Sequence, residues 1–158
     1  MRKKIDMPQS IKRQDRIASD ESVRQLLNEG EYGVLSTVDG NNQPYGVPVS
    51  YVVQEDTLYI HSALQGHKLD NIAVNSQISF CVVGQTELLP DKFSTNYASI
   101  ILFGRAKILA DEDKKHPIQL LLNKYSPDHS DSGARYLEKL LHKTAVIAVT
   151  IEHVTDKA

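Results

Sequence analysis

The sequence contains one cysteine, no tryptophan and no long apolar run. A single cysteine, Cys81, cannot form an internal disulfide and suits a reducing compartment, so we expect a cytoplasmic protein with an unreactive thiol buried in an apolar strand. The longest purely apolar runs, such as residues 100–103, are far too short to span a bilayer. The formal net charge of −2 also argues against a dominant nucleic-acid-binding role.

The usual catalytic and nucleotide-binding motifs are missing as well. The sequence has no G-x-S-x-G, no P-loop and no G-x-G-x-x-G, which argues against an α/β-hydrolase nucleophile and the common nucleotide folds. Its six histidines show no metal-ligand spacing, and no pair of carboxylates stands out as an acid–base couple. We therefore expect no metal site, and an enzyme built on this chain would need a cofactor to carry its chemistry.

The length of 158 residues suits one domain with a real core. Residues 1–18 form a basic arm with few periodic apolar residues, which is typical of a solvated or partner-packed tail. The arm lacks the apolar centre of a secretory signal. Residues 19–158 are expected to form a single domain.

The pattern of this domain is mainly strands with a few helices. Helices are expected from Ser19 to Gly30, from Gly66 onward, and around residues 118–125 and 137–141. A loop is expected at residues 84–95. Strands are expected at residues 32–38, 44–53, 58–61, 77–83, 96–110 and 144–151. Because most of these strands are separated by tight turns, the pattern predicts an antiparallel sheet curled into a barrel with helices attached.

Two strands carry specific signals. Pro44 and Pro48 cannot donate to a ladder, so the second strand is expected at an edge or a bulge. Residues 100–103 are apolar on both faces and must be covered on both, inside a barrel and under either a helix or a second subunit. Gly104 follows them and predicts a bend or bulge.

The stretch "LYIHSALQGHKLDNI", residues 58–72, passes from a strand into a helix at Gly66. His67 and Lys68 then occupy the first helical turn, where the positive end of the helix dipole disfavours cations. A bound anion would resolve this conflict, because helix N-terminal amides and basic side chains together bind phosphate. Alternatively, Asp70 offsets the charge, the side chains are solvated and nothing binds.

These residues resemble a known family. "GVLSTVDGNNQPYGVPVSYVV", "LYIHSALQGHKLDNI", "FCVVG" and "FGRAKI" are similar to flavin-binding split-barrel proteins of the pyridoxamine 5′-phosphate oxidase type, most closely the nitroimidazole-resistance reductases. The resemblance runs from about Gly33 to the C-terminal tail. It implies a mainly β, α+β fold, a six-stranded antiparallel split β-barrel, with FMN at the interface of a homodimer.

The resemblance also assigns cofactor-binding residues. The phosphate is expected at a strand end and helix start, where His67 and Lys68 form the basic pair, and His67 is also a candidate contact to substrate. The flavin ring is expected along the second strand, although Val47 and Val49 also fit as ordinary barrel residues. The implied FMN-binding set is Val47, Pro48, Val49, Ser50, His61, Ser62, Ala63, Gly66, His67, Lys68, Ser94, Thr95 and Ser99. Arg105 is expected to pair across the sheet instead.

The sequence departs from the authentic oxidases in two places. They carry arginine at the position of His67, and a C-terminal tryptophan and arginine that this chain lacks. We therefore expect an FMN-dependent oxidoreductase that takes hydride from a nicotinamide donor and reduces a small acceptor such as a nitroaromatic. The open alternatives are pyridoxamine 5′-phosphate oxidation, a deazaflavin in place of FMN, a non-enzymatic flavin- or haem-binding protein, and a barrel without cofactor that serves as an interaction protein.

Overall fold

The computed structural model describes residues 20–128 and 130–157, so the basic arm and the predicted cap Ser19 lie outside the described residues. The helices are α1 (Asp20–Glu29), α2 (His67–Val74), α3 (Lys115–Tyr125) and α4 (Ser130–Leu141), with short 3₁₀ helices η2 (Pro90–Lys92) and η3 (Asp111–Asp113). The strands are β1 (Gly33–Val38), β2 (Pro44–Val49), β3 (Tyr51–Gln54), β4 (Thr57–Ala63), β5 (Gln77–Leu89), β6 (Ser94–Ile108) and β7 (Thr144–Lys157).

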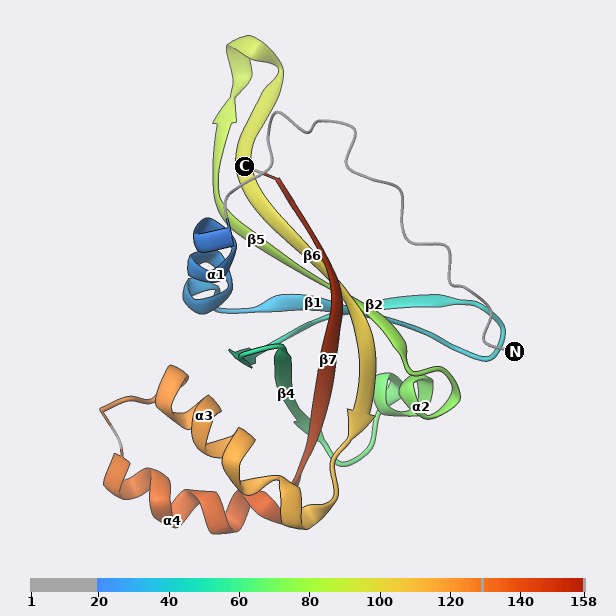
Figure 1. Ribbon diagram of the computed structural model, residues 1–158, viewed down its shortest axis with the longest axis vertical. Helices are drawn as coiled ribbons and strands as arrows, with labels where there is room; N and C mark the ends of the chain where they lie inside the picture. Colours follow the sequence, from blue (N-terminus) through green and yellow to red (C-terminus); the bar gives the residue numbers. More distant parts are fainter. Residues whose placement is uncertain (1–19, 129, 158) are drawn as a thin grey trace.

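The strands form one antiparallel sheet in the order β2-β1-β5-β6-β7-β4-β3 (Figure 1). Its two edge strands, β2 and β3, are consecutive in the chain and are joined by Ser50 alone. The sheet must therefore curl until its edges meet at that residue, which gives the predicted split barrel. Among residues 20–128 and 130–157 the number of strands is seven and not six, because residues 44–54 pair with β1 before Ser50 and with β4 after it. The prolines of β2 lie on an edge strand, as predicted.

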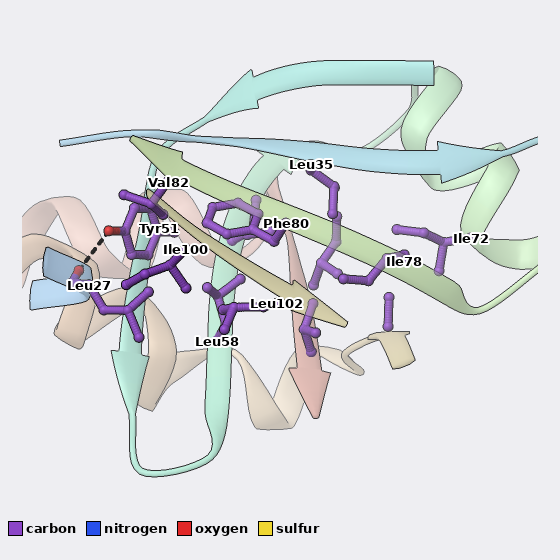
Figure 2. Packing of buried hydrophobic residues seen from close by; sticks show 14 of the residues in the cluster. Leu27, Leu35, Tyr51, Leu58, Ile72, Ile78, Phe80, Val82, Ile100 and Leu102 are labelled. Atoms are coloured by element: carbon purple, nitrogen blue, oxygen red, sulfur yellow. Dashed lines mark hydrogen bonds between the residues drawn. The ribbon is translucent and has the colours of Figure 1, made fainter. Parts of the chain in front are cut away.

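The core lies inside the curled sheet (Figure 2). Alternate residues of the strands point inward, including the fully buried Leu35, Leu58 and Leu102. On the other side of β4 and β7, α3 and α4 pack through a second apolar cluster around Val146. In Figure 1 these two helices sit together at one end of the molecule, on the opposite side of the sheet from α2.

Strand β6 has the two apolar faces that the sequence predicts. Leu102 is 0% exposed inside the barrel, whereas Ile101 on the outer face is 37% exposed. The ladder between β6 and β7 shifts register between Phe103 and Gly104, which is the predicted bulge. A Cβ at Gly104 would overlap the Thr150 carbonyl oxygen, so only glycine fits there.

The predicted loop at residues 84–95 is wrong. Strand β5 continues to Leu89 and pairs with the start of β6, from Thr86 opposite Tyr97 to Leu89 opposite Ser94. The resulting β5–β6 hairpin extends beyond the barrel at the top of Figure 1. Along residues 20–128 and 130–157, no helix combines the length and apolarity needed to cross a bilayer.

Candidate functional site

The start of α2 is exposed peptide with no side-chain cap. Gly66 adopts φ 159° and ψ 169°, a conformation that is essentially restricted to glycine. A Cβ there would meet nothing within 4 Å, so glycine is required for this backbone conformation and not to avoid a steric clash. The first helical bond runs from the Asp70 N–H to the Gly66 carbonyl oxygen, at 3.1 Å. The amides before Asp70 have no intrahelical partner and can bind an anion.

Both predicted basic residues lie in this first turn. His67 is exposed and stacks on Tyr45 of β2, with ring centroids 4.1 Å apart and an interplanar angle of 27°. Lys68 is half-buried. Partial burial lowers the pKa of His61 at the end of β4, and the positive charge of Lys68 lowers it further. The structure therefore brings His61, His67 and Lys68 to one end of the sheet.

The two residues of the strand end point in different directions. Ile60 is buried, so by the alternation of β4 His61 lies on the opposite face and Ser62 on the same face as Ile60. The Ser62 hydroxyl donates to the Ala63 carbonyl oxygen at 2.7 Å. Its proton is therefore engaged locally, and Ser62 offers an incoming phosphate only an acceptor in this conformation. Ala63 is exposed and pairs with Thr144 of β7.

Strand β2 lies beside α2 at one end and reaches Ser50 at the other. Val47 and Val49 pack against the core, as barrel residues do, while Pro48 is exposed on the opposite face. Because β2 is an edge strand, part of its peptide groups have no ladder partner. This strand can therefore present to a flat ligand its free peptide groups, the ring of Pro48 and the half-buried Ser50.

The predicted site residues of β6 lie elsewhere. Just after the C-terminal end of α2, the Ala106 N–H donates to the Ser76 carbonyl oxygen at 2.8 Å, so this end of β6 lies beside α2. Ser94 is twelve residues away along the same strand, which corresponds to roughly 40 Å. Thr95 and Ser99 also lie toward the β5–β6 hairpin, opposite Leu88 and Val83. One copy of the chain therefore does not bring Ser94, Thr95 and Ser99 to α2.

Three other sequence predictions concern residues outside this site. Arg105 pairs across the sheet with Glu152 of β7, Nε to Oε1 at 3.2 Å, as predicted. Cys81 is half-buried and not fully buried as predicted, and this burial raises the pKa of its thiol, which keeps it protonated and weakly nucleophilic. In the part of the chain that the structure describes, no three histidine, cysteine or acidic side chains are grouped closely enough to hold a metal ion.

Just beyond the far end of β2, Tyr51 at the start of β3 is the centre of a cluster that the sequence does not indicate. The Tyr51 N–H donates to the Tyr125 hydroxyl at 3.0 Å, and Lys124 Nζ donates to the Tyr51 carbonyl oxygen at 2.9 Å. The ammonium lies 3.8 Å from the centroid of the Tyr51 ring, and burial lowers the pKa of Lys124 to about 8. The Tyr51 hydroxyl donates to the Leu27 carbonyl oxygen at 2.6 Å. This cluster holds α1 and α3 against the edge of β3, where the sheet has no further strand.

Comparison with known proteins identifies one matching family and many solved structures that share this fold. The family model for pyridoxamine 5′-phosphate oxidase matches residues 19–158. No curated protein matches the sequence significantly.

Three solved structures illustrate the shared fold. A protein from Bacteroides thetaiotaomicron VPI-5482, proposed to confer 5-nitroimidazole antibiotic resistance, superposes with a TM-score of 0.73 at 20% identity, covering 90% of this chain and 85% of that one. The conserved hypothetical protein Rv2991 from Mycobacterium tuberculosis gives 0.80 at 15% identity, covering 94% and 89%. An FAD- and haem-binding protein from Mycobacterium smegmatis gives 0.74 at 21% identity, covering 88% and 70%. Identities this low establish a common fold only.

Proposed function

The chain belongs to the pyridoxamine 5′-phosphate oxidase family, and on that premise we propose that it binds FMN and works as a cytoplasmic flavin-dependent oxidoreductase. The observation that carries the proposal is the start of α2. There His67 and Lys68 lie beside amides that have no side-chain cap, behind a glycine that leaves the peptide open to approach. A phosphate dianion would satisfy these amides and both basic side chains.

The position of β2 supports FMN as the ligand that supplies this phosphate. The strand runs from Tyr45, next to His67, to Val49 and then Ser50. Five residues of strand span roughly 16 Å. A phosphate at α2 and a flat ring along Val47, Pro48 and Ser50 can therefore belong to one molecule. In this arrangement the free peptide groups of β2 would bond the polar edge of the ring, and Pro48 would offer an apolar contact.

Bound FMN would supply the hydride chemistry between a nicotinamide donor and a small acceptor such as a nitroaromatic. The chain itself would anchor the phosphate through Lys68 and the α2 amides and orient the ring along β2. His67 is exposed at the same place, so its imidazole could also contact a substrate above the ring. The resistance protein from Bacteroides favours a nitro compound as acceptor.

A homodimer would complete the site. Ile101 on the outer face of β6 is 37% exposed and Val83 beside it on β5 is 51% exposed, which leaves an apolar surface that a second copy can cover. Ser94, Thr95 and Ser99 lie far from α2 of their own chain, so only the residues of a second copy could reach a ligand bound there. This supports our proposal that the flavin lies at the subunit interface.

The proposal is tested with the purified full chain. We expect FMN to bind, NAD(P)H to bleach its visible absorbance anaerobically, and a nitroaromatic compound to restore it. The double variant His67→Ala, Lys68→Ala should lose affinity by at least about 100-fold, because each of the two charge-assisted bonds contributes about 1.5–3 kcal/mol. Lys139→Ala removes an exposed lysine of α4 and is the matched control.

Other outcomes separate the alternatives. Unchanged FMN affinity in the double variant would show that the phosphate lies elsewhere. Bound flavin that no donor reduces would indicate a non-enzymatic flavoprotein, and a Soret band would indicate haem, which the protein from M. smegmatis binds together with FAD. A monomer that retains tight FMN binding would contradict the interface site.

A further inference from the structure

Helix α2 is held by two contacts that come from neighbouring strands. The Asn71 side-chain amide donates to the Thr37 hydroxyl oxygen at 3.0 Å, and both residues are buried, at 3% and 0% exposure. The second contact is the stack of His67 on Tyr45. Thr37 belongs to β1 and Tyr45 to β2, and the two residues are direct cross-strand partners.

The spacing of the two contacts explains why they form together. His67 and Asn71 are four residues apart on the helix, so their Cβ atoms lie about 5–6 Å apart on one face. Directly opposed residues of antiparallel strands have Cβ atoms about 4.5–5.5 Å apart. The pair on the helix therefore matches the pair on the sheet, and α2 lies across β1 and β2. Asn71 with Thr37 is the buried anchor, and Tyr45 with His67 is the outer contact.

The outer contact acts on an exposed side chain of the proposed phosphate site. Without the Tyr45 ring, the imidazole of His67 would rotate freely in solvent above the first turn of α2. Holding a side chain in one orientation before binding removes the entropy cost of ordering it on binding, which corresponds to roughly 2- to 10-fold in affinity. The stack leaves the edge of the imidazole, with its nitrogens, available to a ligand.

Resting on the proposed function, we propose that Tyr45 is a positioning residue of the phosphate site, which holds the imidazole of His67 in one orientation at the first turn of α2 and thereby favours a phosphorylated flavin over an unphosphorylated one. Tyr45 acts through His67 and needs no contact with the ligand itself. Its phenol hydroxyl is not required for this role, since the ring provides the stack.

The test compares the dissociation constants of FMN and riboflavin, whose ratio isolates the contribution of the phosphate. The wild-type ratio should be large, and Tyr45→Leu should lower it by about 2- to 10-fold through weaker FMN binding with riboflavin affinity unchanged. Tyr45→Phe should restore the ratio. Tyr32→Leu, at a tyrosine that is 62% exposed before β1, is the matched control. If Tyr45→Leu does not fold, Tyr45→Thr replaces it with a residue suited to an edge strand.

A double-mutant cycle with His67→Ala decides whether Tyr45 acts through the imidazole. We expect Tyr45→Leu to have no further effect on the ratio once His67 is alanine. Equal losses of FMN and riboflavin affinity, or additive effects in the cycle, would overturn the inference and leave the proposed function intact. A wild-type protein that binds neither flavin, or binds both equally, overturns the proposed phosphate site and this inference with it.

Discussion

The hydrogen bond from the Tyr51 hydroxyl to the Leu27 carbonyl oxygen offers a sharp test of how the barrel is held together, through the variant Tyr51→Phe. The bond is 2.6 Å long and connects β3 to the last turn of α1 (Figure 2). Tyr51 is 0% and Leu27 7% exposed, so water cannot replace the lost hydroxyl without a rearrangement. The Leu27 carbonyl is one of the last four of its helix, which lack intrahelical donors.

The expected cost follows from what the substitution leaves behind. The ring, its packing edge-on against Phe80 and its contact with Lys124 all remain, so only the hydrogen bond is removed. A buried acceptor left without a donor costs about 1–3 kcal/mol. For a chain of this length that corresponds to a fall in Tm of roughly 2–12 °C.

The assay is urea unfolding followed by circular dichroism, with Tyr32→Phe as the control at an exposed tyrosine. The control should stay within about 0.5 kcal/mol of wild type. A Tyr51→Phe variant that is equally unaffected would refute the reasoning, because the Leu27 carbonyl would then have another partner or access to water.

Alkaline pH gives a second test, of the burial of the Tyr51 phenol. Burial, and next the neighbouring Tyr125, raise the pKa of Tyr51 well above its usual value near 10. Above about pH 10 the unfolded chain ionises this phenol while the folded chain does not, so the stability of the wild-type protein falls there. Phenylalanine has no such proton, and the gap in stability between Tyr51→Phe and wild type should narrow as the pH rises beyond 10.

Three further substitutions test other parts of the structure. Burial lowers the pKa of Lys124 from 10.5 to about 8, so the unfolded chain binds more protons than the folded chain between these two pH values. The free energy of unfolding should therefore rise from pH 8 to 10 in wild type but not in Lys124→Met. Urea titrations at each pH would measure this difference. Gly104→Ala places a methyl group against the Thr150 carbonyl oxygen and should cost about 1–3 kcal/mol in urea unfolding. Gly66→Ala meets no atom but strains the backbone, so it should lose about 1–3 kcal/mol and also weaken FMN binding in a fluorescence titration.

Each of these has an outcome that contradicts it. A rise in stability that persists in Lys124→Met would assign the alkaline behaviour to another group. The glycine variants are compared with Gly40→Ala, where a Cβ would meet only a Val74 methyl group at 3.8 Å and little change is expected. If Gly66→Ala were as stable as Gly40→Ala, the argument from backbone strain would be wrong. If Gly104→Ala were as stable as Gly40→Ala, the argument from its close contact with β7 would be wrong.

Local patterns were sufficient to predict several features correctly. A strand followed by glycine and an apolar helical repeat predicted the start of α2 at His67, and a glycine in a doubly apolar strand predicted the bulge at Gly104. Both depend on residues that are neighbours in the chain. The split of residues 44–54 at Ser50 could not be read in this way, because the two halves differ only in the strands they pair with.

The missed features depend on contacts between distant segments. Residues 84–95 contain Pro90 and Asp91, which are typical of a turn. The segments on either side of these two residues form strands only because β5 and β6 pair there in register. The stack of Tyr45 on His67 joins residues from two elements whose relative position no periodicity records. The same is true of Lys124. In the sequence it is an ordinary lysine near a helix end, and only the fold brings it to the Tyr51 carbonyl oxygen of β3.

The place of β7 in the sheet constrains how the protein can assemble while it is being synthesised. Strand β7 follows all its partners in the chain, yet it lies between β6 and β4 near the middle of the sheet. Until it leaves the ribosome, the hairpin of β3 and β4 has no ladder to the other four strands, and the apolar surfaces on both sides of the gap stay uncovered. Such long-range pairing is slow to form. Until β7 pairs with β6 and β4, the unpaired edges of these two strands are therefore open to association with another chain.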